Sequence, residues 1–119
     1  MGELNIRRFR VVEVSMLPTL RPGDMLLARA DTAPEPGSIV VFPDPRAGRW
    51  LVKRVAAVSD GEAWVESDNA DATRADSRTL GWVKTDHMCR AILRYRFPVG
   101  LRVLRPRERA GWLRLPRRG

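Results

Sequence analysis

Two residues of this chain have side chains that together could carry out proteolysis, Ser15 and Lys53. Ser15 follows a short apolar stretch and begins the sequence Ser-Met-Leu-Pro-Thr-Leu, so we expect its hydroxyl at a strand end, before a proline-constrained turn. A serine hydroxyl is a weak nucleophile unless a base removes its proton. His87 is the sole histidine and has no partner pattern that marks it as a triad member. The base must therefore be of another residue type.

Lys53 has the physical properties that such a base needs. It lies inside the apolar run 50–58, where two-residue alternation puts it on the same face as Leu51 and Val55. Burial on that face disfavours the charged amine and can lower a lysine pKa by several units, enough to accept the serine proton near neutral pH. Arg54 points to the opposite face and stays protonated, so we expect it to pair with an acid. The sequence thus predicts Ser15 as nucleophile and Lys53 as general base.

The elements that must position these residues are short strands. Glycine and proline recur between short apolar runs that are rich in β-branched and aromatic residues. Asp60-Gly61 is typical of a hairpin turn, and no helical periodicity is convincing beyond a turn near Pro18. We therefore expect a compact, mainly β domain with little helix. The expected strands are residues 10–14, 25–28, 39–42, 50–58, 63–65 and 91–97.

Five sequence boxes between residues 13 and 81 resemble, in the same order, those of the type I signal peptidases, which are serine proteases with a Ser-Lys dyad. The resemblance implies an antiparallel catalytic domain with a polar bracing loop. Two positions depart from the boxes, because Ser38 stands in place of an aspartate and Ser67 in place of a glycine. The boxes are residues 15–20, residues 23–27, residues 36–42, residues 52–55, and residues 67–69 continuing to 76–78 and Gly81.

The resemblance also implies roles for the polar loop 66–78. In that family the first aspartate of the loop pairs with the arginine beside the base, which here implies Asp68 with Arg54. A later hydroxyl orients the lysine amine. Thr73 is the candidate for this role, and Ser77 stays open because the loop is one residue longer than the usual spacing.

Further site assignments follow from the same resemblance. Asp76 and Arg78 would form a second internal pair, and Met16 would line a substrate pocket for small residues. The backbone N–H of Ser15 would donate to the oxyanion. Relatives commonly have a hydroxyl residue and a glycine where this chain has Glu13-Val14, so a side-chain donor is missing. The loss of one such donor can cost about 10² to 10³ in rate.

The net charge of +8 is concentrated at the two ends of the 119-residue chain. Residues 1–10 carry +2 and residues 99–119 carry +6, which leaves twelve basic and twelve acidic side chains in residues 11–98. We therefore expect a basic N-terminal arm (1–10), one catalytic domain (11–98) and a basic Arg/Leu/Trp tail (99–119). The balanced body does not favour nucleic acid as a partner. The single cysteine excludes an internal disulfide.

The prediction for function is a serine endopeptidase that removes signal or leader peptides through an acyl-enzyme, without a metal or organic cofactor. Its partner would be a protein or peptide substrate. No apolar run of about 18 residues is present, so we expect a short form without a membrane anchor, cytoplasmic or peripherally membrane-associated.

Two alternatives remain open. Within the same chemistry, the short form also resembles the proteases that trim the leader of nickel-type superoxide dismutase. In another class, the chain would be a catalytically inactive basic module whose arms bind anionic membrane or nucleic acid, with the tail 99–119 docking on the lipid surface. His87 and Cys89 could share one strand face, but no third group completes a thiol-protease pattern.

Overall fold

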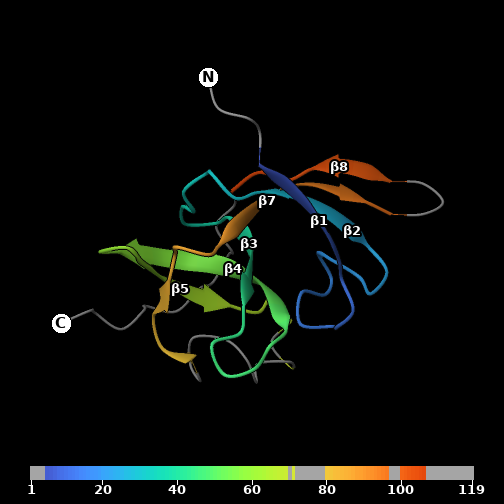
Figure 1. The fold of residues 1–119 in the computed structure, drawn as a ribbon. Helices are drawn as coiled ribbons and strands as arrows, with labels where there is room; N and C mark the ends of the chain where they lie inside the picture. Colours follow the sequence, from blue (N-terminus) through green and yellow to red (C-terminus); the bar gives the residue numbers. More distant parts are fainter. Residues whose placement is uncertain (1–4, 70, 72–79, 97–99, 107–119) are drawn as a thin grey trace.

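Short runs of β-branched and aromatic residues, separated by Gly, Pro and Asp, form eight antiparallel strands in the described part of the chain (Figure 1). The computed structural model describes residues 5–69, 71, 80–96 and 100–106. These residues include almost no helix, so the predicted mainly β, antiparallel class is confirmed. None of the helical structure in these ranges is long and apolar enough to cross a membrane.

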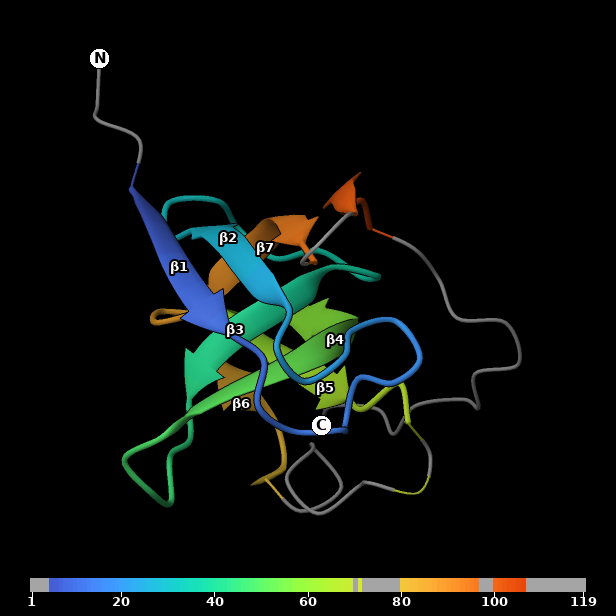
Figure 2. The ribbon, with the colours of Figure 1, turned by 90° about the vertical axis from the view of Figure 1, so that its right-hand side faces the viewer.

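The strands form one sheet in the order β1-β2-β7-β3-β4-β5-β6, with β8 paired to β7. The ladder can be followed in Figure 2 from β1 through β7 and β3 to β6. β7 is shared, because its first residues pair with β3 and its last residues pair with β8. The strands are β1 (Ile6–Arg10), β2 (Met25–Arg29), β3 (Ile39–Pro43), β4 (Trp50–Ser59), β5 (Glu62–Glu66), β6 (Val83–Lys84), β7 (Cys89–Tyr95) and β8 (Leu101–Val103).

The predicted hairpin between β4 and β5 is confirmed. Asp60 and Gly61 both have positive φ angles, of 52° and 75°. Such angles are required at the two central residues of a tight turn that matches the right-handed twist of its strands. The hairpin continues from Ser59 opposite Glu62 toward Arg54 opposite Glu66. The residue that follows β5 is thereby brought beside the middle of β4.

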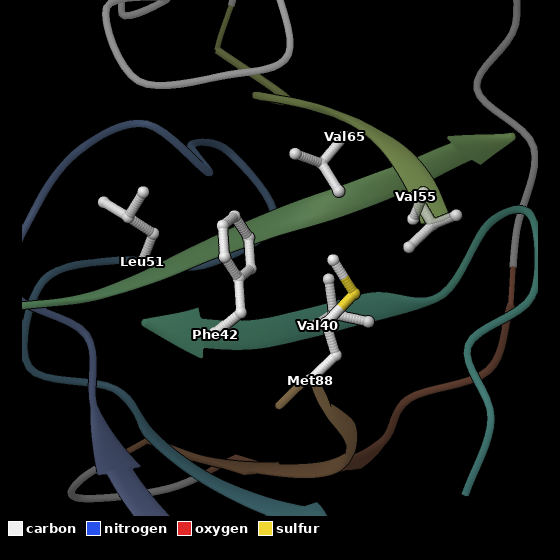
Figure 3. Packing of buried hydrophobic residues seen from close by; sticks show 7 residues of the cluster. Val40, Phe42, Leu51, Val55, Val65 and Met88 are labelled. Atoms are coloured by element: carbon white, nitrogen blue, oxygen red, sulfur yellow. The ribbon is translucent and has the colours of Figure 1, made fainter. Parts of the chain in front are cut away.

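Strand β3 lies between two apolar clusters because it is buried on both faces. Val40 and Phe42 point into the first cluster, where Figure 3 shows side chains of β3, β4 and β5 packed together with Met88. Ile39 and Val41 point into the second cluster. The first cluster is Val40, Phe42, Leu51, Val55, Ala63, Val65 and Met88. The second cluster is Val11, Met16, Leu20, Leu26, Ile39, Val41 and Ala91.

The expected strand over residues 10–14 is wrong, because β1 ends at Arg10. Beyond Arg10 the chain leaves the ladder. The Val11 N–H donates to the Asp24 carbonyl at 2.8 Å, and the Val11 carbonyl accepts the Gly23 N–H at 2.7 Å. These bonds close a loop over residues 11–24 instead of extending the strand.

Strand β1 was not predicted from the sequence, because residues 1–10 were expected to form a basic arm. The short strands β6 and β8 were not predicted either. They contain two and three residues, too few to display an alternating pattern. Residues of both basic ends take part in the sheet, because β1 carries Arg7, Arg8 and Arg10 and β8 carries Arg102.

The packing of Phe42 makes it a strong test of the first cluster. Phe42 is 1% exposed, whereas Val58 on the neighbouring strand is 39% exposed. We predict that Phe42→Ala lowers the free energy of unfolding by about 3–5 kcal/mol, because it leaves a cavity in the core. Val58→Ala, the control, should stay within about 0.5 kcal/mol of the parent. Urea unfolding followed by tryptophan fluorescence measures both, and equal losses would contradict the assignment of the core.

Candidate active site

Ser15 lies in the turn that joins β1 to β2. The Leu17 N–H donates to the Val14 carbonyl at 3.1 Å, and the Leu20 N–H donates to the Met16 carbonyl at 2.9 Å. Met16 and Leu20 are fully buried in the second apolar cluster and anchor the turn to it. Ser15 itself is 7% exposed. The sequence thus places a nearly buried hydroxyl on a turn anchored by apolar side chains.

Lys53 lies in the middle of β4 and is 2% exposed, as the alternation predicted. Its strand partner across β3 is Val40, and Leu51 and Val55 flank it on the same face. Three members of the first apolar cluster therefore pack around the aliphatic part of the Lys53 side chain. The Nζ atom donates a hydrogen bond to the Ser67 hydroxyl at 3.0 Å. The amine is therefore hydrogen-bonded to a hydroxyl beside a largely apolar wall.

Residues 67–69 directly follow β5. They form hydrogen bonds both with Lys53 and with the turn that contains Ser15. Ser67 accepts the hydrogen bond from Lys53. Asn69 binds the turn of the serine, since its backbone N–H donates to the Ser15 carbonyl at 2.9 Å and its Nδ2 donates to the Val14 carbonyl at 3.0 Å. We call residues 67–69 the bridging segment.

The bridging segment brings Ser15 and Lys53 into one neighbourhood. Its two anchoring residues, Ser67 and Asn69, are two positions apart, a separation that spans at most about 7 Å of extended chain. No hydrogen bond joins the Ser15 hydroxyl to Lys53, or to any other residue that the structure describes. Catalytic hydrogen bonds are often long before substrate binds and shorten in the complex. The bridging segment therefore links the Ser15 turn to the Lys53 amine through hydrogen bonds at Asn69 and Ser67.

Asp68, the middle residue of the bridging segment, pairs with Arg54 as predicted. Arg54 donates from Nε and Nη2 to the two carboxylate oxygens at 2.8 Å each, and from Nη1 to the Gly37 carbonyl at 2.9 Å. Both side chains are 7% exposed. Asp68 also accepts the Thr19 hydroxyl at 2.6 Å. This carboxylate ties the bridging segment to β4 and to the serine turn at the same time.

A cavity of about 50 Å³ opens beside Ser15. Its wall includes Ser15, residues 9–13 and residues 50–52. Glu13 lies at this wall with half of its side chain exposed and pairs with Arg49 at 2.9 Å. Of the backbone groups here, the Ser15 N–H has no acceptor among the described residues, so it is available as a donor. The cavity has room for a small side chain next to Ser15.

Comparison with protein-family models matches residues 3–59 to the family described as signal peptidase, peptidase S26. The match supports membership in the signal peptidase family. It covers just under half of the chain and contains both Ser15 and Lys53. Comparisons with curated proteins and with solved structures found no match. A protease function of the signal peptidase kind is thus supported, with a protein or peptide as substrate.

Sequence reasoning missed the contacts that Ser67, Asn69 and Thr19 make in the site. The role of orienting the lysine went to Thr73 or Ser77, which lie outside the described residues together with Asp76 and Arg78. The position of Ser67 depends on the register of the β4–β5 hairpin. The hairpin register pairs Arg54 with Glu66, so the next residue after β5 falls beside Lys53. Ser67 carries a hydroxyl where the signal peptidase box has a glycine.

Other sequence candidates lie away from this chemistry. Met16 is buried in the second apolar cluster and is not part of the cavity wall, so its contact with substrate stays a prediction. His87 is exposed, whereas Cys89 is buried in the sheet. Burial raises the pKa of the Cys89 thiol, which disfavours a thiolate nucleophile. No group of three or more potential metal ligands occurs among the residues described.

The Arg54–Asp68 pair predicts a large stability difference between two ion pairs of this chain. Asp68→Ala leaves the Arg54 guanidinium buried without its carboxylate, so the free energy of unfolding should fall by about 3–5 kcal/mol. The matched control is Asp31→Ala, which breaks the exposed pair with Arg29 and should cost about 0.2–1 kcal/mol. Urea unfolding compares the two variants. Equal losses would show that Asp68 does not hold the bridging segment.

Proposed function

We propose that this chain is a serine endopeptidase that cleaves signal or leader peptides, with Ser15 as nucleophile and Lys53 as general base. The observation that carries the proposal is the bridging segment, which binds the Lys53 amine through Ser67 and the Ser15 main chain through Asn69. The family match over residues 3–59 supports it independently, since it includes both residues.

Acylation starts when the substrate carbonyl lies against Ser15. In the proposed step the Lys53 amine, which lies against the apolar side chains of Leu51, Val55 and Val40, takes the Ser15 proton while it is in its neutral form. The Ser15 Oγ forms a bond to the carbonyl carbon, and the negative charge moves to the carbonyl oxygen. The tetrahedral intermediate collapses when the C–N bond breaks and Lys53 returns the proton to the leaving amine.

Deacylation reverses the same roles. Water attacks the ester carbon while Lys53 takes a proton from the water and then returns it to the Ser15 oxygen as the ester bond breaks. In both steps the Ser15 N–H donates to the oxyanion. Glu13 has no hydroxyl to donate a second hydrogen bond to the oxyanion. The Ser15 N–H therefore provides the oxyanion stabilisation without a side-chain donor at position 13.

The surface beside Ser15 favours a peptide with small and apolar side chains. The cavity of about 50 Å³ suits a small residue next to the scissile bond. Val12 and Val14 are 72% and 47% exposed and offer apolar contacts to an extended peptide in the same region. These features agree with a leader segment that has small residues before the cleavage point.

Removal of the nucleophile or the base should abolish processing. Ser15→Ala should leave no detectable cleavage of a leader-bearing precursor with alanines before the cleavage point, and Lys53→Met should lower kcat by about 10² to 10⁴-fold. Lys84→Met removes an exposed strand lysine and should keep parental activity. Mass spectrometry of the precursor measures the product. Processing by Ser15→Ala at the parental rate would refute the proposal.

Loss of the Ser67 hydroxyl should affect turnover and not substrate binding. We expect Ser67→Ala to lower kcat about tenfold, because the amine loses a hydrogen bond that fixes its position. KM should stay unchanged, since Ser67 is 2% exposed and does not line the cavity. Ser59→Ala, at the end of β4, is the matched control. A change confined to KM would show that Ser67 does not position Lys53.

A further inference from the structure

Four arginines gather where β7 and β8 approach the turn before β2. Arg94 on β7 lies directly opposite Arg102 on β8, so their side chains share one face of the sheet. Arg96 follows β7, and Arg21 lies in the turn that leads to Asp24. Like charges directly opposite each other destabilise a strand pair. This arginine cluster is Arg21, Arg94, Arg96 and Arg102.

Asp24 neutralises only one of these four arginines. Arg96 donates to its two carboxylate oxygens at 2.9 and 3.0 Å, and the Arg21 backbone N–H adds a third bond at 2.9 Å. Burial alone would raise the pKa of Asp24, but the hydrogen bonds from Arg96 and Arg21 outweigh it and hold the pKa below its ordinary value. Among the described residues of this cluster, four guanidinium groups face one carboxylate, an excess of three positive charges.

Arg94 is the member whose hydrogen bonds are incomplete. Its side chain is buried, with 8% of the residue exposed, and its Nε has no hydrogen-bond partner. Its Nη2 makes one long contact of 3.4 Å with the Gly100 carbonyl. Burial lowers the pKa of Arg94, and Arg96 lowers it further. Buried polar groups are nearly always satisfied, so the unpaired Nε shows that this guanidinium is incompletely hydrogen-bonded among the described residues.

We propose that the arginine cluster binds a phosphate group. A guanidinium presents two parallel N–H donors that match the oxygens of a phosphate, and such charge-assisted bonds are stronger than neutral ones. The anion would lie against the exposed Arg21 and Arg102, beside the buried Arg94, and would reduce the repulsion between the opposed strands. A free phosphate and a lipid headgroup share this chemistry. The site is separate from the Ser15 cavity, because none of its arginines lines that cavity.

The test compares inorganic phosphate with chloride at equal ionic strength. Calorimetry on the full chain should detect phosphate binding that chloride does not replace. Arg102→Gln should weaken that binding about tenfold or more, as expected for one lost charge-assisted bond. Arg94→Gln should do the same. Arg102 is exposed, so its variant keeps the test valid even if the buried Arg94 variant fails to fold.

Arg8→Gln is the matched control, because it removes one exposed arginine from β1. It should bind phosphate as the parent does. The second arm uses vesicles of phosphatidylcholine with and without phosphatidylglycerol. Binding to free phosphate alone would identify a soluble ligand. Selective binding to the anionic vesicles would identify a lipid headgroup. Failure of both probes, or equal weakening by Arg8→Gln, would overturn the proposal. Ser15→Ala should bind like the parent, so this result is independent of the proposed protease activity.

Discussion

The structure depends on the placement of one amine inside an apolar wall. Lys53 sits between Leu51 and Val55 and opposite Val40, and its Nζ is hydrogen-bonded to the Ser67 hydroxyl. A buried lysine is stable only where a partner meets its donors, because an unpaired charge in such a wall is costly. The residues after β5 therefore have to stay beside β4, and their other contacts follow from this requirement.

The two apolar clusters position different parts of the site. The second cluster holds the serine turn through Met16 and Leu20, while the first cluster packs against Lys53. Strand β3 separates the clusters and keeps them in register, since all of its first four residues are buried. The bridging segment then joins the two halves. Its central Asp68 contacts both Arg54 on β4 and Thr19 in the serine turn, so the site is fixed from three directions.

Much of this could be predicted from the sequence, because the signals are local. The alternation around Lys53 predicted its burial, and Asp60-Gly61 predicted the hairpin that aligns β5 with β4. The role of Ser67 could not be assigned in the same way, since it depends on the register between two strands and on where the chain turns after β5. The strand expected at residues 10–14 failed for a similar reason, because bonds with residues 23 and 24 replace the ladder there.

The account rests on Lys53 activating Ser15, and covalent trapping tests this claim most directly. The full chain is mixed at neutral pH with a peptide activated ester, and peptide mapping by mass spectrometry locates the acyl group over time. The account predicts acylation of Ser15 in the parent and acylation slower by about 10²-fold or more in Lys53→Met. An acyl group on another residue, or equal rates in the two proteins, would contradict it.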